Sequence, residues 1–100
     1  MSIFGHPGEL KIPPQAKENR AAQEVFHVWS SGDHQDFIIK HDIWDDPAAW
    51  GLLLVDVARH VSRAFQERGH DKDEVYRRIL EGFQAEAESP TGDPTGEIEK

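Results

Sequence analysis

The sequence predicts an α+β domain in which a β-hairpin packs on an antiparallel two-helix hairpin, with a short N-terminal edge strand as an optional addition. Three observations predict this class. Two runs of β-branched and aromatic residues flank a Gly-Asp turn at residues 32–33, as in a hairpin. Segments 47–68 and 72–88 then carry apolar residues at helical spacing. The Gly-His link between them is so short that the helices must form an αα-hairpin.

The ends of the chain are expected to lie outside this domain. Residues 1–22 predict an extended arm and linker, because proline and glycine interrupt them repeatedly. Leu10 and Ile12 alternate with charged residues there, which fits either an edge strand or a docked extended arm. Residues 23–88 form the single domain. Residues 89–96 contain no apolar residue and two prolines, so 89–100 is predicted to be a disordered acidic tail.

The hairpin should present two different apolar faces. With Gly32-Asp33 as a two-residue loop, Val28 faces Phe37 and Phe26 faces Ile39. We call these four residues the Phe26 face. A one-residue slip would rearrange the pairs. The opposite face, which we call the Trp29 face, is too apolar for simple exposure to solvent and carries Val25, His27, Trp29 and Ile38.

The first helix is predicted to start with Asp45 or Asp46 as its N-cap and Pro47 in the first helical position, where the missing N–H costs nothing. Gly69 after Arg68 predicts a left-handed stop. The apolar residues of this helix form one continuous face, which we call the apolar stripe: Trp50, Leu53, Leu54, Val57, Val61, Ala64 and Phe65.

The second helix is predicted to follow at once. Asp71 matches the N-cap of a capping box, and Glu74 occupies its third helical position. The apolar residues of this helix again share one face and are Val75, Tyr76, Ile79, Leu80, Phe83 and Ala87.

Composition excludes several classes of protein. The chain has no cysteine, which rules out disulfides, thiolate metal sites and cysteine nucleophiles. No signal peptide opens it, and its longest near-apolar run, residues 48–55, is too short for a membrane span. We therefore expect a cytoplasmic protein without membrane association. The formal charge is −8, and phosphate-rich partners would be repelled, so nucleic-acid binding is not expected.

A domain of about 65 residues has a marginal core and commonly needs a staple, a metal or a partner subunit. Because no disulfide is available, we expect a homodimer formed through the Trp29 face or the hairpin edges. His27 lies on that face and would make assembly sensitive to pH if it were buried at the contact. A partly buried histidine with a local hydrogen bond is the simpler interpretation.

Few residues suggest a bound ion. Asp56 and His60 lie four residues apart on the first helix and could share a divalent cation. Two ligands do not make a site, and Arg59 and Arg63 beside them would repel the ion. A solvated helix face with paired charges explains all four residues.

Trp44 and Trp50 flank the start of the first helix and offer two interpretations. They could clamp a small apolar ligand, or they could staple the end of a strand onto the helix. No nucleophile, general base or phosphate-loop motif accompanies them, so neither an enzyme nor a cofactor is expected.

The string Trp44-Asp45-Asp46-Pro47-Ala48-Ala49-Trp50-Gly51 is the most specific part of the chain. Together with Glu24-Val25, Val28-Trp29, Ala58-Arg59-His60-Val61 and Ser89-Pro90-Thr91, it resembles a family of small bacterial proteins classified only as a domain of unknown function. The resemblance spans roughly Leu10 to Gly96. It implies no activity, ligand or catalytic residue, although it suggests that such proteins share the aromatic cap and Arg59-His60.

The resulting functional prediction is a non-catalytic interaction or accessory protein that self-associates and binds an unknown protein partner. The alternative is a small-ligand or divalent-ion binding protein that uses Trp44, Trp50, Asp56 and His60.

Overall fold

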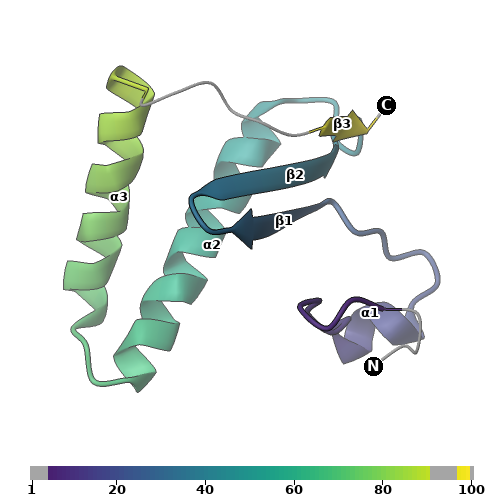
Figure 1. Cartoon of the computed structure of the whole chain (residues 1–100), viewed down its shortest axis with the longest axis horizontal. Helices are drawn as coiled ribbons and strands as arrows, with labels where there is room; N and C mark the ends of the chain where they lie inside the picture. The colour runs from purple at the N-terminus through teal and green to yellow at the C-terminus, as the bar shows by residue number, and fades with distance from the viewer. Residues whose placement is uncertain (1–4, 91–96, 100) are drawn as a thin grey trace.

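The structure, a computed structural model, describes residues 5–90 and the backbone of residues 97–99. The α+β class is confirmed, because a β-hairpin and a pair of antiparallel helices dominate the chain (Figure 1). The elements in chain order are α1 (Pro14–Glu18), β1 (Phe26–Ser31), β2 (His34–Lys40), α2 (Ala48–Glu67), α3 (Lys72–Glu88) and β3 (Glu97–Glu99).

The hairpin has the predicted register. Val28 pairs with Phe37 and Phe26 pairs with Ile39, so these four residues lie on one face of the hairpin as predicted. Gly32 takes the first of the two turn positions with φ of 68°. A positive φ at that position alone is the pattern of a type II′ turn, whose twist matches that of the flanking strands.

A third strand completes the sheet, whose order is β1-β2-β3. β3 runs parallel to β2 and pairs Ile39 with Ile98. The sequence predicts no strand here, because Glu-Ile-Glu offers a single apolar residue to a period-two pattern. Of the predicted tail, residues 91–96 and 100 lie outside the described residues.

The N-terminal arm does not add a strand. Leu10 and Ile12 lie outside any strand and are 90% and 56% exposed, and the prolines after them open the short helix α1. The arm touches the sheet farther upstream instead. The His6 ring packs edge-on against Trp29 with ring centroids 4.8 Å apart, and its Nδ1 accepts a hydrogen bond from the Gly8 amide at 2.9 Å.

Both long helices begin close to their predicted caps. The Asp46 carboxylate accepts a hydrogen bond from the Ala48 amide at 3.0 Å, and Pro47 already has helical dihedrals. Regular helix starts at Ala48, one residue later than predicted. Asp71 caps α3 as predicted, by accepting from the amides of Asp73 and Glu74.

The link between the helices is a Schellman motif. The Gly69 amide donates to the carbonyl of Gln66, and the His70 amide donates to the carbonyl of Phe65. Gly69 has φ of 96°, which confirms the predicted left-handed stop. The Phe65 and His70 rings pack at 5.3 Å and add the apolar contact typical of this motif.

Replacing Gly69 with alanine should destabilise this turn. A Cβ there would meet no atom within 4 Å, so the cost is the backbone strain of a non-glycine residue at positive φ. We expect a loss of about 1–2 kcal/mol in the free energy of unfolding, measured by urea denaturation. Gly82→Ala is the matched control, because Gly82 lies inside α3 and also has free space around it. Gly82→Ala should be neutral or stabilising, and equal effects of the two changes would contradict this account of the turn.

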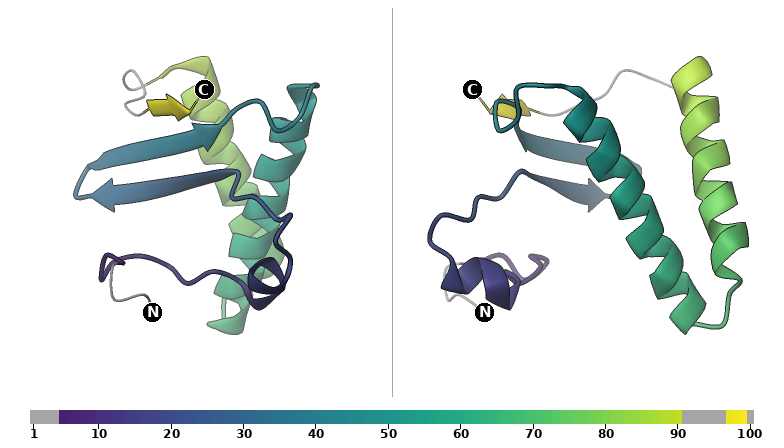
Figure 2. Two further views of the ribbon diagram at one scale, coloured as in Figure 1. Left: turned by 90° about the vertical axis from the view of Figure 1, so that its right-hand side faces the viewer. Right: turned by 180° about the vertical axis from the view of Figure 1, so that it is seen from behind.

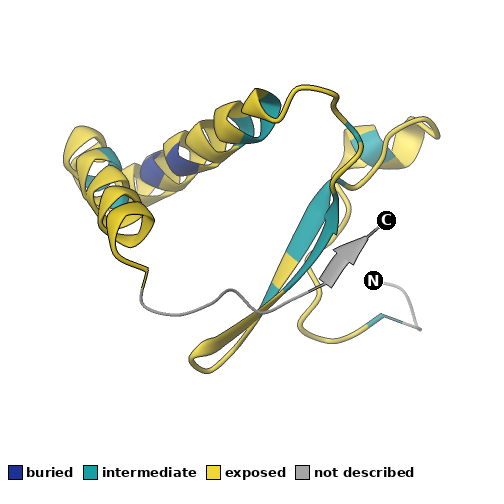
Figure 3. Ribbon diagram, turned by 90° about the horizontal axis from the view of Figure 1, so that it is seen from above, coloured by how far each residue is buried: buried dark blue, intermediate teal, exposed yellow. Residues whose placement is uncertain are grey.

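The helices pack through small residues. Ala58 and Ser62 are one turn apart on α2 and are the buried residues of the described chain, with exposures of 7% and 1%. They face α3, where Val75, Tyr76 and Ile79 are half-buried. Figure 3 shows this small buried patch on α2 and the open arrangement around it.

The sheet and the helix pair meet at one corner. Trp50 at the start of α2 contacts Phe26 of β1 with ring centroids 6.2 Å apart. From this corner the two halves diverge instead of packing face to face (Figures 2 and 3). The radius of gyration is 15.7 Å, against about 13 Å for a compact chain of this length. The single chain therefore has an open arrangement.

Candidate functional site

The main surface feature of the chain is an apolar face that the other described residues leave partly exposed. The apolar stripe lies beside the Ala58–Ser62 contact rather than in it, so α3 covers little of it. Trp50 and Leu53 are half-buried at the corner with the sheet. Farther along the stripe, the side chains are between 36% and 45% exposed, namely Leu54, Val57, Val61 and Phe65.

The sheet contributes a second apolar surface, which begins beside the stripe. Trp50 belongs to the stripe and Phe26 to the Phe26 face, so the two apolar surfaces start at the same corner and then separate. Val28, on the Phe26 face, is 43% exposed. We call Val28, Leu54, Val57, Val61 and Phe65 together the open apolar face.

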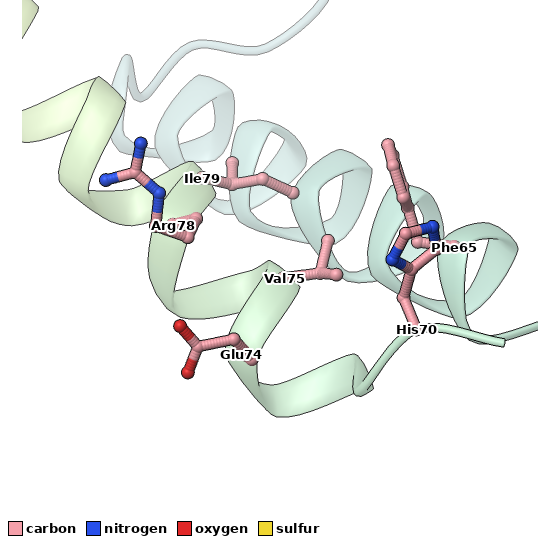
Figure 4. Close-up of a pocket in the computed structure, with 6 residues that line it drawn as sticks. All are labelled: Phe65, His70, Glu74, Val75, Arg78 and Ile79. Atoms are coloured by element: carbon pink, nitrogen blue, oxygen red, sulfur yellow. The ribbon is translucent and has the colours of Figure 1, made fainter.

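At the helix turn the open apolar face ends in a hollow. Figure 4 shows Val75 and Ile79 of α3 pointing toward α2, with the Phe65 and His70 rings beside them. Glu74 and Arg78 lie at its outer edge, away from the two rings. The hollow is shallow and mostly apolar, so it extends the face and offers few polar groups that would select a ligand.

The sequence identifies the residues of this surface but not their exposure. Apolar residues at helical spacing normally mark the side of a helix that is buried. Here the buried side is marked by Ala58 and Ser62, whose small side chains contribute little to any hydrophobic pattern. Which side of α2 is buried therefore depends on where α3 packs, and the sequence pattern of α2 alone does not show this.

The Trp29 face is a half-buried patch of the sheet. Trp29 is partly covered by His6, and Val25, His27 and Ile38 are also half-buried. His27 Nδ1 lies 2.9 Å from Glu24 Oε1, a local hydrogen bond on the exposed side of the strand. The four residues predicted from the sequence are thus brought together, although the N-terminal arm already occupies part of their surface.

Trp44 and Trp50 contact each other. Their rings are edge-on at 5.2 Å, and Trp50 also touches Phe26. Three aromatic rings therefore connect the loop before α2, the helix itself and β1. This arrangement fits a staple between strand and helix, which is one of the two interpretations that the sequence leaves open.

Asp56 and His60 lie on the exposed side of α2. No ion pair joins either of them to another described residue. Within residues 5–90, no third histidine, aspartate or glutamate lies close enough to complete a metal site with them. No helix in the described part of the chain is long and apolar enough to cross a membrane.

Residues 9–91 match a family described as Domain of unknown function (DUF5076). The chain belongs to this family. The resemblance seen in the Trp44–Gly51 string is thereby confirmed, and the matched region runs from the N-terminal arm to just beyond α3. A DUF5076 assignment carries no activity with it. No curated protein matches the chain.

This DUF5076 chain is also similar to a solved structure, described as that of "a putative pyruvate dehydrogenase from the photosynthetic bacterium Rhodopseudomonas palustrus CGA009". The two chains are 32% identical, with a TM-score of 0.76 over 95% of this chain and 98% of the other. The fold is therefore shared over almost the full length of both.

Proposed function

We propose that the protein is a non-catalytic interaction protein that works as a homodimer, in which a second copy covers the open apolar face. The exposure of Val57 and its neighbours on that face is the observation that carries this proposal. Apolar side chains exposed along the helix from Leu54 to Phe65 would leave a large contiguous patch in contact with water, and such patches on stable proteins mark interaction sites.

The amount of exposed surface supports a dimer. The chain presents 8963 Å² of accessible surface, whereas a folded monomer of this mass has about 5,800 Å². Part of this excess belongs to the extended N-terminal arm, and the rest is in line with additional surface that a second copy would bury. A protomer with one buried apolar side chain in its described part also has too small a core to be stable alone.

A second copy suits the shape of this surface. A two-fold contact places the same patch on both sides and therefore needs a surface that complements itself. The stripe of one chain would pack against the stripe of the other, with apolar side chains on both sides. The sequence suggests the Trp29 face or the hairpin edges for this contact. The open apolar face is the better candidate, because His6 already covers part of Trp29.

The first test is the mass of the full chain in solution, from light scattering after size exclusion over a range of concentrations. We expect twice the mass of one chain, and a midpoint of thermal unfolding that rises with protein concentration, because association stabilises the folded state. A monomer that unfolds cooperatively at every concentration would overturn the proposal. The open apolar face would then have to be covered by a different molecule.

A further inference from the structure

A cluster of cations lies on the other side of the helix pair. Arg59 and Arg63 of α2 and Lys72 of α3 line one pocket, together with Ser62, Tyr76 and Asp73. The three cations outnumber the single carboxylate, although the chain as a whole carries a charge of −8. Helical spacing puts Arg59 and Arg63 on the side of α2 opposite the apolar stripe, so this pocket is separate from the open apolar face.

These cations are not neutralised within the described chain. Arg59, Arg63 and Lys72 form no ion pair with any described residue. The arginines on the outer side of α3 behave differently. Arg77 lies between Glu74 and Glu81, and its hydrogen bond to Glu74 and the charges of both carboxylates raise the pKa of the guanidinium.

The neighbouring groups hold part of this cluster in place. The guanidinium of Arg59 lies over the Tyr76 ring, 5.9 Å from its centroid, so a planar contact orients it. Ser62 forms part of the pocket wall. Its hydroxyl donates a hydrogen bond to the Ala58 carbonyl at 2.8 Å, so this proton is not available to a ligand. The Asp71 carboxylate is likewise occupied by backbone amides at the start of α3.

We propose that this pocket binds a small molecule through an oxyanion, either a phosphate or a carboxylate group. Two guanidinium groups match the geometry of both oxyanions and can form paired hydrogen bonds with them, and a lysine adds a point charge. A net lining charge of two positive units favours a doubly charged group, so phosphate should bind more tightly than a monocarboxylate. A pocket of about 320 Å³ is suited to a small molecule.

The proposal can be tested with the full chain by titration calorimetry and by amide chemical shifts, at low ionic strength. The probes are inorganic phosphate and acetate, with chloride at the same ionic strength as a blank. We expect saturable phosphate binding, with shifts confined to residues 59–63 and 72–76, and weaker acetate binding. Acetate binding as tightly as phosphate would identify a carboxylate as the ligand group. No saturable binding of either anion would overturn the proposal.

The double change Arg59→Gln with Arg63→Gln should weaken phosphate binding at least tenfold. Lys17→Gln with Arg20→Gln is the matched control, because it removes the same charge near α1, away from the pocket. An equal loss in both variants would show an effect of net charge only and would also overturn the proposal. Circular dichroism verifies that the helices of each variant are intact. If the first variant is unfolded, the shift map of the wild-type chain decides the question.

Discussion

Val57→Glu should dissociate the proposed dimer into separate chains, either folded or unfolded. Val57 lies at the centre of the open apolar face and is 41% exposed in the single chain, so the change leaves an isolated protomer almost unaffected. In the dimer, the same carboxylate would be buried against apolar side chains without a partner, which costs several kcal/mol. A two-fold contact contains each residue twice, so the cost is paid at two places. We expect the dissociation constant to rise by more than about 100-fold.

The matched control is Leu52→Glu. Leu52 is on the same helix and is 71% exposed, but helical spacing puts it on the side opposite the stripe. The two variants therefore share the helix, the substituted charge and the loss of an aliphatic residue. Light scattering should give a monomer, or an unfolded chain, for Val57→Glu and a dimer for Leu52→Glu. A dimer of unchanged affinity in Val57→Glu would show that the stripe is outside the interface.

Trp50→Ala should have the largest effect on the fold itself. Trp50 joins three segments, because its ring contacts both Phe26 and Trp44, and it provides the aromatic link between the sheet and the helix pair. Truncating a large aromatic residue in a packed site commonly costs 3–5 kcal/mol. Trp50 is half-buried, so we expect about 2–4 kcal/mol in the free energy of unfolding, measured by urea denaturation at fixed protein concentration.

Trp44→Ala provides the comparison for this result. Trp44 touches Trp50 and is 37% exposed, and it has no ring contact with the sheet. Its loss should cost less than half as much, and the near-ultraviolet circular dichroism of the remaining tryptophans should survive. A cost for Trp44→Ala equal to that of Trp50→Ala would mean that the link to Phe26 contributes little.

Much of the fold is readable from the sequence because its determinants are local. The hairpin register follows from a two-residue turn with glycine in its first position. The starts of both long helices follow from aspartates that cap backbone amides, and the turn between them follows from Gly69. Each of these features depends on a few residues that are close together in the sequence, so it can be predicted without knowledge of the tertiary structure.

The relative placement of these parts is not readable in the same way. The hydrophobic pattern of α2 indicates a face that avoids water, but it does not specify whether α3, the sheet or a second chain covers it. β3 is also hard to predict from the sequence. A strand of three residues forms because the edge of β2 is available for pairing, and this depends on the tertiary structure. The cation cluster combines Arg59 and Arg63 with Lys72 from the next helix, and their convergence is a property of the folded helix pair.

The contacts within the single chain also affect how long a newly made copy is exposed to proteases in a cell. Apart from β3 and the Phe26–Trp50 contact, its main contacts join elements that are neighbours along the chain, namely β1 with β2 and α2 with α3. Contacts of this kind form within microseconds to milliseconds. In the proposed dimer, the slow step would then be the encounter of two chains, and its rate would depend on the concentration of the protein. At low protein concentration, a newly made chain would wait longer for a partner and would be exposed to proteases for longer. The lifetime of the protein would therefore increase with its rate of synthesis.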